Sequence, residues 1–264
     1  MIQRIAKILN TLYTEYKNYF VSWETSLNMI EPEITSYCSL TCHNCNRSVR
    51  QAPTREHMSP EQINKFVQES LDLNYVWNTI TILGGEPTLH PNFFEIIALI
   101  KKYKDKYNDC RVQIATNGHG LVVNNALIKM PDWVVILNSS KQSNKQIFSS
   151  YNIAPIDLKK YRKKNFIKGC PITHYCGLGL NRYGYYCCGP GAGVDRIFAF
   201  NVGLHSLSLV NRNAMRKQLK LLCQYCGHFK DIYGEEKISE DKLSPSWEKA
   251  YNEYRKNKLR LPLY

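Results

Sequence analysis

From residue 29 onward, short strand-like apolar runs alternate with segments whose apolar residues recur at helical spacing. Four short apolar runs have the length of buried strands, over 29–35, 79–83, 111–116 and 133–137. Between them, apolar residues recur at helical spacing over 59–73, 92–107 and about 125–129. The order of these segments predicts an α/β fold with a parallel sheet and helical crossovers, in which ligands bind at the carboxyl ends of the strands.

Both ends of the chain depart from this alternation. Residues 2–20 carry apolar side chains at helical spacing and predict an amphipathic helix within 1–28, packed on the body or lying on a membrane or partner. After about residue 165, glycine, cysteine and aromatic residues with little periodicity precede a helix over 211–222. We therefore expect a core over 29–164, a small module over 165–230, and a C-terminal helix with a basic tail over 231–264.

Composition and charge narrow the class of protein. The 264 residues are 44% hydrophobic and 22% charged, with no apolar run of the roughly 20 residues that span a bilayer and no secretory signal, which favours a cytoplasmic protein. The net charge of +13 gathers in 159–168 and 212–220. No nucleic-acid-binding signature accompanies it, so we expect solvated surfaces or a phosphorylated substrate rather than nucleic acid.

Ten cysteines form two clusters, with Cys110 standing apart at the start of a predicted strand. A chain of this size needs no disulfide framework, and clustered thiols in a reducing compartment more often bind metal. The first cluster is Cys38, Cys42 and Cys45, spaced C-x3-C-x2-C. Three thiolates on one loop can hold three irons of a [4Fe–4S] cube and leave the fourth iron open. Spacing alone leaves open a structural zinc site with His43 as fourth ligand.

A second motif, Gly84-Gly85-Glu86-Pro87, directly follows the strand over 79–83. Glycines at a strand end let the backbone approach a ligand closely. With the cysteine triplet on the preceding strand exit, this pairing resembles the radical S-adenosylmethionine (SAM) superfamily over about residues 29–140. The resemblance implies a partial (β/α) TIM-like barrel, a [4Fe–4S] cluster on the three cysteines, and SAM bound to its open iron.

The resemblance also implies roles for the strand ends. Gly84 to Pro87 would lie at the SAM amino group, while Thr116-Asn117 and Ser139 would lie near the ribose. One electron from a donor such as flavodoxin or ferredoxin then cleaves SAM to a 5′-deoxyadenosyl radical that takes hydrogen from the substrate. No catalytic side chain is assigned. Many members carry an aromatic residue before the third cysteine, where this chain has Asn44.

The remaining cysteines lie in the C-terminal module and resemble the auxiliary-cluster modules, named twitch or SPASM, of the same superfamily. The spacings Cys170-x17-Cys188 and Cys223-x2-Cys226 resemble the twitch of 2-deoxy-scyllo-inosamine dehydrogenase-type enzymes. Because a SPASM module uses more cysteines than remain here to hold two clusters, the resemblance implies one further [4Fe–4S] cluster, the twitch case, on these four cysteines. Cys187 and Cys176 are the alternate ligands. A structural zinc site is the alternative for the whole set.

An auxiliary cluster with four thiolate ligands has no open iron and is suited to accept an electron from the substrate. We therefore expect an oxidoreductase that dehydrogenates a sugar or aminocyclitol-like small molecule, with Arg182 and Arg196 as candidate contacts for a phosphate or nucleotide group. Two alternatives remain. One is a radical SAM enzyme that crosslinks or epimerises a ribosomal peptide; the other is a non-catalytic iron–sulfur or zinc protein that binds RNA.

Overall fold

The computed structural model describes residues 5, 9, 21–141, 148–231, 242–257 and 261–264. Within them, six strands form one sheet in the order β4-β3-β2-β1-β5-β6. Neighbouring strands are parallel except for β5 and β6, which are antiparallel. The strands are β1 (Met29–Thr35), β2 (Thr79–Gly84), β3 (Arg111–Thr116), β4 (Val134–Asn138), β5 (Leu178–Asn181) and β6 (Gly184–Tyr186).

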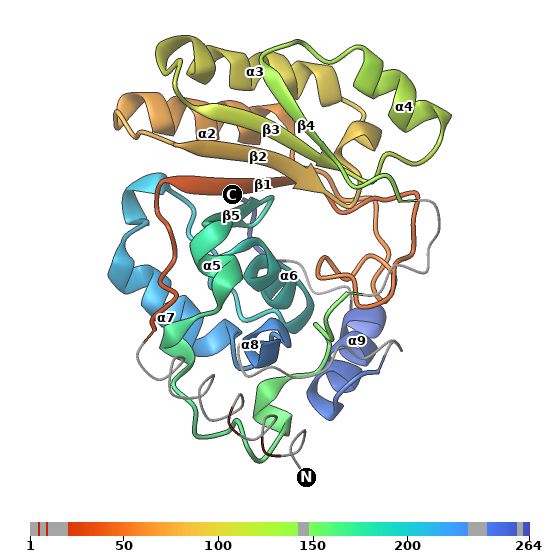
Figure 1. Ribbon diagram of the computed structural model, residues 1–264, viewed down its shortest axis with the longest axis vertical. Coiled ribbons are helices and arrows are strands. Elements are labelled where there is room, and N and C mark those ends of the chain that lie inside the picture. Colours follow the sequence, from red (N-terminus) through yellow and green to blue (C-terminus); the bar gives the residue numbers. More distant parts are fainter. Residues whose placement is uncertain (1–4, 6–8, 10–20, 142–147, 232–241, 258–260) are drawn as a thin grey trace.

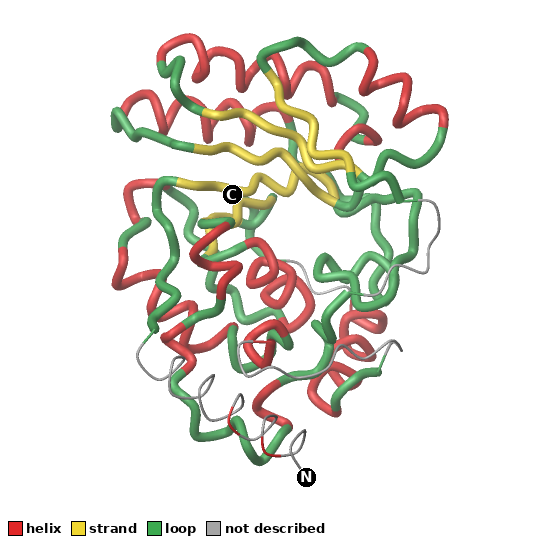
Figure 2. The backbone as a smooth tube through the Cα atoms, in the orientation of Figure 1, coloured by secondary structure: helices red, strands yellow, loops and turns green. Residues whose placement is uncertain are grey.

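The helices lie in two groups on either side of the sheet (Figures 1 and 2). The first group follows β1 to β3 in the sequence, and the second belongs to the C-terminal part. The α-helices are α2 (Pro60–Asp72), α3 (Phe93–Lys106), α4 (Leu121–Ile128), α5 (Pro171–Tyr175), α6 (Gly189–Phe198), α7 (Arg212–Leu222), α8 (His228–Asp231) and α9 (Pro245–Asn257). The predicted α/β class and the partial, open form of the barrel are confirmed by this arrangement.

Isoleucine-rich strands and amphipathic helices build the core next to the site. Ile34, Ile80, Ile82 and Ile114 are at most 1% exposed and pack with the apolar faces of α2 and α3. The four predicted core strands agree with the observed ones to within one residue at each end. Helix α4 begins at Leu121, earlier than predicted, because its N-cap is Gly120, which has no side chain to mark the start of a helix in the sequence.

The start of α2 follows the predicted capping chemistry. Ser59 accepts a hydrogen bond from the backbone N–H of Gln62 at 3.3 Å, and the Gln62 side chain accepts one from the N–H of Ser59 at 3.0 Å. This reciprocal pair satisfies two donors that would otherwise have no intrahelical partner.

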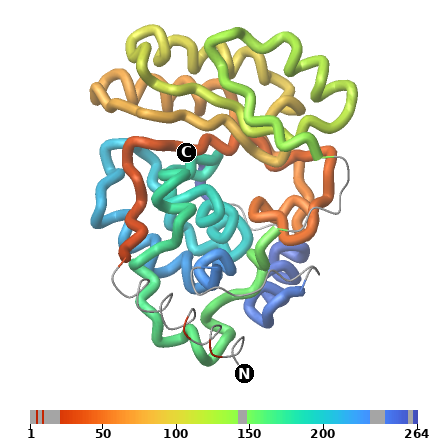
Figure 3. The backbone as a smooth tube through the Cα atoms, viewed as in Figure 1, coloured from red at the N-terminus to blue at the C-terminus, as the bar shows by residue number. Residues whose placement is uncertain are grey.

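The sheet continues across the boundary expected near residue 165. Strand β5 pairs in parallel with β1, and β6 returns beside β5 as a short hairpin. Helix α6 then packs on β5 and β1. In Figure 3 the teal segment that contains β5 and α6 therefore lies beside the red β1. The cysteine-rich segment extends the central sheet instead of forming a separate layer.

The end of the chain packs back onto this sheet rather than forming a free tail. Tyr264 is 8% exposed, and its hydroxyl donates to Glu69 at 2.8 Å beside Tyr185. The helix predicted for residues 2–20 lies outside the described residues apart from Ile5 and Leu9, which are exposed. None of the helices within the described ranges is long and apolar enough to cross a membrane.

Trp247 attaches α9 to the rest of the protein and offers a test of this packing. It is 0% exposed, contacts the rings of Tyr151 and Phe198, and donates its indole N–H to the carbonyl of Tyr225 at 2.7 Å. Trp247→Ala should lower the free energy of unfolding by about 3–5 kcal/mol. In anaerobic urea unfolding, Lys249→Ala on the exposed face of α9 should stay within about 0.5 kcal/mol of the parent. Equal stability of both variants would contradict this assignment.

Candidate active site

The three cysteines of the first cluster meet in one cavity at the carboxyl end of the sheet. Cys38, Cys42 and Cys45 lie on the loop after β1, and all three line a cavity of about 230 Å³. The ends of the next three strands form other parts of its wall, through Leu83, Gly84, Gly85, Ala115, Thr116, Asn117, Leu137 and Ser139. Parallel pairing thus gathers at one edge motifs that are far apart in the sequence.

Gly84 and Gly85 approach the cysteine segment so closely that no side chain fits. A Cβ on Gly84 would lie 2.4 Å from a backbone oxygen of β1. One on Gly85 would lie 2.3 Å from the carbonyl oxygen of Tyr37 and 2.9 Å from the Cβ of Cys38. The next residue, Glu86, donates its backbone N–H to that same carbonyl at 2.8 Å. The glycine pair therefore holds the end of β2 against the start of the cysteine loop.

Glu86 turns away from the cavity, although the sequence led us to expect its carboxylate at the SAM amino group. It is 0% exposed. Its Oε1 accepts from the hydroxyls of Thr88 and Thr116 at 2.7 and 2.8 Å, and its Oε2 accepts from the backbone N–H of Asn117 at 2.7 Å. These bonds occupy both carboxylate oxygens and tie the end of β2 to the end of β3. Pro87 opens a short 3-10 helix and does not line the cavity either.

The other predicted SAM-contact residues do line the cavity. Asn117 also donates its side-chain amide towards the Sγ of Cys38 at 3.6 Å. Ser139 donates its hydroxyl to the carbonyl of Thr116 at 2.9 Å, which joins the ends of β3 and β4. Lys141 completes this part of the wall and was not expected, because it follows the last strand motif in a segment without periodicity.

Asn44 departs from the common family pattern for a conformational reason. Its φ is 52°, in the left-handed region, and its side chain is 0% exposed. Asparagine adopts this backbone conformation at less cost than an aromatic residue does. The loop between Cys42 and Cys45 thus turns in a way that an aromatic side chain would disfavour.

The second cysteine set lines a closed cavity between the C-terminal helices. Cys170 caps the start of α5, Cys188 caps the start of α6, and Cys223 follows the end of α7. The cysteines that line this cavity are Cys170, Cys187, Cys188, Cys223 and Cys226. Cys176 is not among them; its thiol lies beside Glu31 instead. The four chosen ligands therefore meet in one place, together with the alternate Cys187.

The thiols differ in how readily they ionise. Burial raises the pKa of Cys38 to about 11 and that of Cys170 to about 12. Cys188 is the exception, since a hydrogen bond from the Cys187 thiol and the backbone N–H of Gly191, at 3.3 Å from its Sγ, lower its pKa. Ligation of Cys38 and Cys170 to iron therefore releases their protons.

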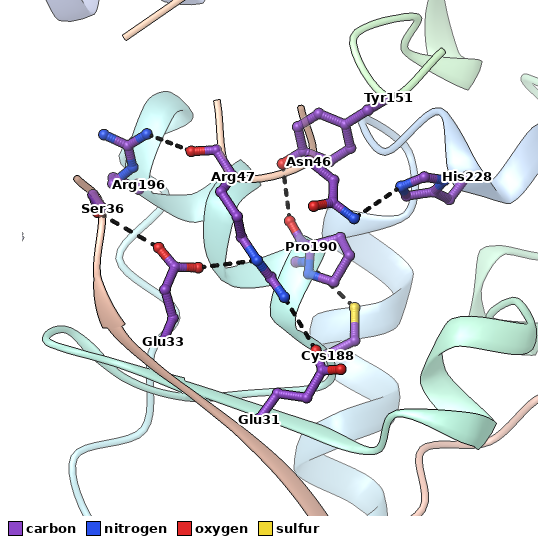
Figure 4. A network of polar contacts seen from close by, with 11 residues as sticks. Glu31, Glu33, Ser36, Asn46, Arg47, Tyr151, Cys188, Pro190, Arg196 and His228 are labelled. Atoms are coloured by element: carbon purple, nitrogen blue, oxygen red, sulfur yellow. Dashed lines mark hydrogen bonds and ion pairs between the residues drawn. The ribbon is translucent and has the colours of Figure 1, made fainter. Parts of the chain in front are cut away.

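Residues directly after Cys45 reach into the second module (Figure 4). The side-chain amide of Asn46 lies 3.4 Å from Nε2 of His228, two residues beyond Cys226. Arg47 lies 3.1 Å from Glu31 and 3.4 Å from Glu33, both on β1. The ion pairs of Arg47 with Glu31 and Glu33 could not be predicted from the sequence, because a charged pair between a loop and a strand leaves no periodic signal.

Both arginines expected to contact a phosphate have partners within the protein, Arg196 in the interior and Arg182 nearer the surface. Arg196 is 2% exposed and donates to the carbonyls of Arg47 and Ala52 at 2.9 and 3.4 Å. It therefore supports the segment after the first cysteine loop. Arg182 forms an ion pair with Glu56 at 3.9 Å. Neither arginine is among the residues that line the cysteine cavities.

Residues 33–135 match the sequence model of the radical SAM superfamily. The chain contains a radical SAM domain. The matched span runs from β1 into β4 and includes the first cysteine set and the strand ends around it. The radical SAM domain identifies the chain as an enzyme.

Curated relatives share part of this domain. Proteins named "Probable GTP 3′,8-cyclase" are 36% identical over 85 residues in Methanococcus vannielii and 31% identical over 99 residues in Methanocaldococcus jannaschii. These matches cover 32% and 38% of this chain. They span only 27% and 30% of the relatives' own length.

Two solved structures resemble the chain at low sequence identity. BtrN in complex with AdoMet and 2-DOIA aligns with a TM-score of 0.47 and 17% identity, over 82% of this chain and 98% of that one. Streptococcus suis SuiB bound to precursor peptide SuiA aligns with a TM-score of 0.33 and 17% identity, over 51% of this chain and 28% of that one. Neither alignment is close enough to transfer a substrate.

Radical SAM enzymes use a [4Fe–4S] cluster and SAM, and the first cavity suits both. Three thiols can hold three irons and leave the fourth for a further ligand. Beside them, Gly84 and Gly85 expose backbone rather than side chains, and Asn117 brings an amide donor to Cys38. The donor set of this cavity therefore fits the cofactors that the family requires.

Gly85→Ala tests the close approach at the first cavity. The added methyl group would overlap the backbone of Tyr37 and displace Cys38, so we expect the reconstituted protein to lose about four irons and its binding of SAM. Iron analysis and equilibrium dialysis with SAM measure both effects. Pro87→Ala, just outside the cavity, should retain both. Retention of full iron and SAM binding by Gly85→Ala would contradict the role of this contact.

Glu86→Gln tests whether Glu86 holds the strands together. The glutamine has only one acceptor atom, so either the N–H of Asn117 or the N–H of Thr88 would face its amide NH2 group and lose its acceptor. We expect the free energy of unfolding to fall by about 1–3 kcal/mol, measured on the metal-free protein in urea. An unchanged stability would show that these bonds contribute nothing net.

Proposed function

We propose that this enzyme dehydrogenates a hydroxyl-bearing small molecule, of the sugar or aminocyclitol class, with a second [4Fe–4S] cluster as the electron acceptor. The observation that carries the proposal is the second set of buried thiols, which lies across Arg47 from the SAM cavity. Radical chemistry that leaves the substrate oxidised needs a place for one electron, and a fully thiolate-ligated cluster is suited to that task.

The most suitable ligands for this cluster are Cys170, Cys188, Cys223 and Cys226. Burial raises the pKa of Cys223 and of Cys226, and the neighbouring thiols Cys170 and Cys188 raise both further. All four side chains line the same cavity. Three helix ends and the turn after α7 supply them, so the site is assembled only when the C-terminal part is folded.

The wall of the first cavity supports a polar, electron-rich substrate. The charged side chains among its described lining residues are Arg47, whose guanidinium is paired with Glu31 and Glu33, and the cation Lys141. Asn46, Asn117 and Ser139 add amide and hydroxyl groups that can bond to hydroxyls of a ligand. This lining supports a polyhydroxylated molecule, including one that carries a phosphate or nucleotide group.

The proposed conversion of a carbinol to a carbonyl balances as follows: the C–H hydrogen leaves with 5′-deoxyadenosine, the hydroxyl proton goes to solvent, and the remaining electron goes to the second cluster. The protein residues hold the substrate against the strand ends and exclude water. A flavodoxin or ferredoxin would supply the electron that starts each turnover.

Iron content and product mass test the proposal. The anaerobically reconstituted enzyme should bind about eight irons, form 5′-deoxyadenosine from SAM and dithionite, and give products two hydrogens lighter from a panel of sugars and aminocyclitols. Cys42→Ala should abolish cleavage of SAM. Cys223→Ala with Cys226→Ala should retain about four irons and SAM cleavage but lose dehydrogenation.

Cys110→Ala is the matched control, because Cys110 is 2% exposed in the core and lines neither cysteine cavity. It should keep both clusters. About four irons with one zinc in the parent would contradict the auxiliary cluster. A solvent deuterium gained in a peptide, with no loss of hydrogen, would instead support the epimerisation of a peptide substrate.

A further inference from the structure

A single buried arginine lies between the two thiol sets and keeps one donor unpaired. Arg47 is 7% exposed. Its Nη2 donates to Oε2 of Glu31 at 3.1 Å, and its Nε lies 3.4 Å from Oε2 of Glu33. Its Nη1 is buried and has no hydrogen-bond partner among the described residues. A buried guanidinium nitrogen without a partner is costly, so a further negative neighbour is expected close to it.

The unpaired Nη1 of Arg47 packs against the backbone of Gly189, the residue after Cys188. A Cβ on Gly189 would be 2.3 Å from Nη1 and 2.6 Å from Nη2 of Arg47. Cys188 itself caps the ten-residue helix α6, and its Sγ accepts the N–H of Gly191 at 3.3 Å (Figure 4). The guanidinium, the helix N-terminus and this N–H all bring positive charge to one thiolate.

Glu31 brings negative charge to the same place. A Cβ on Gly189 would lie 2.7 Å from its Oε2, so the carboxylate and the guanidinium of Arg47 flank the backbone after Cys188 together. A cluster held by four thiolates is an anion that becomes more negative when it is reduced. In a buried site with a low dielectric constant, a nearby cation favours the reduced form and a nearby anion favours the oxidised form.

We propose that Arg47 and Glu31 set the reduction potential of the second cluster, Arg47 by raising it and Glu31 by lowering it. The inference rests on the proposed function, because it requires a cluster that includes Cys188. Arg47 is then a positioning residue rather than a catalytic one. Its place two residues after Cys45 makes the electron acceptor depend on the correct fold of the first cysteine loop.

Potentiometric titration followed by electron paramagnetic resonance measures this effect on the holoenzyme, with the first cluster recognised by the change of its signal on addition of SAM. Arg47→Met keeps the length of the side chain and removes the charge. It should lower the equilibrium constant for reduction of the second cluster at least tenfold. For a one-electron couple, this lowers the reduction potential by about 59 mV or more. Glu31→Gln should shift the potential the opposite way. Arg212→Met, an exposed arginine at the start of α7, should leave it unchanged.

The paired variants separate electrostatics from damage to the fold. Opposite shifts with iron content retained support the proposal, whereas no shift in either variant, or shifts in the same direction, overturn it. If Arg47→Met fails to assemble the second cluster, the sign of the Glu31→Gln shift decides. An unsubstituted protein with only about four irons would overturn the proposed function, and this inference with it.

Discussion

The parallel pairing of β1 with β5 is the constraint on which both cysteine sites depend. In its register Glu31 stands opposite Gly179. A Cβ on Gly179 would lie 2.6 Å from the carbonyl carbon and oxygen of Cys188, so the start of α6 rests directly on β5. Gly189 leaves the same space free for the guanidinium of Arg47. Because two glycines remove the side chains that would separate these layers, the start of α6 packs directly against the buried ion pair between Arg47 and Glu31.

The core strands and the first site could be predicted because their signals are local. β2 and β4 are nearly continuous apolar runs, and β1 and β3 carry apolar residues at strand spacing; parallel pairing then brings Cys38, Gly85 and Asn117 to one edge. Strands β5 and β6 have only 4 and 3 residues and include glycine, so their pairing is determined by burial against β1 rather than by pattern. The role of Glu86 was missed for a related reason: hydrogen bonds to β3 cannot be inferred from its own neighbours in the sequence.

Burial raises the pKa of several cluster thiols, whereas hydrogen bonding lowers that of Cys188 despite its burial. Burial keeps most of the thiols protonated before ligation, since the pKa values of Cys38 and Cys170 are raised to about 11 and about 12. Each such ligand must lose its proton to iron, which couples assembly of the cluster to pH and to folding. Cys188 differs from them, because the backbone N–H of Gly191 in α6 and the charge of Arg47 lower its pKa and favour its thiolate.

Cys187 and Cys188 also differ in how readily they ionise, which bears on the choice of ligand that the sequence left open. The two Sγ atoms converge on one glycine, since a Cβ on Gly191 would lie 3.4 Å from the first and 3.3 Å from the second. The Cys187 thiol donates a hydrogen bond to the Sγ of Cys188, which raises the pKa of Cys187 and lowers that of Cys188. The N–H of Gly191 and the charge of Arg47 favour the same outcome, a thiolate on Cys188. The arrangement thus favours Cys188 as the ligand and Cys187 as a protonated thiol that donates a hydrogen bond to its sulfur.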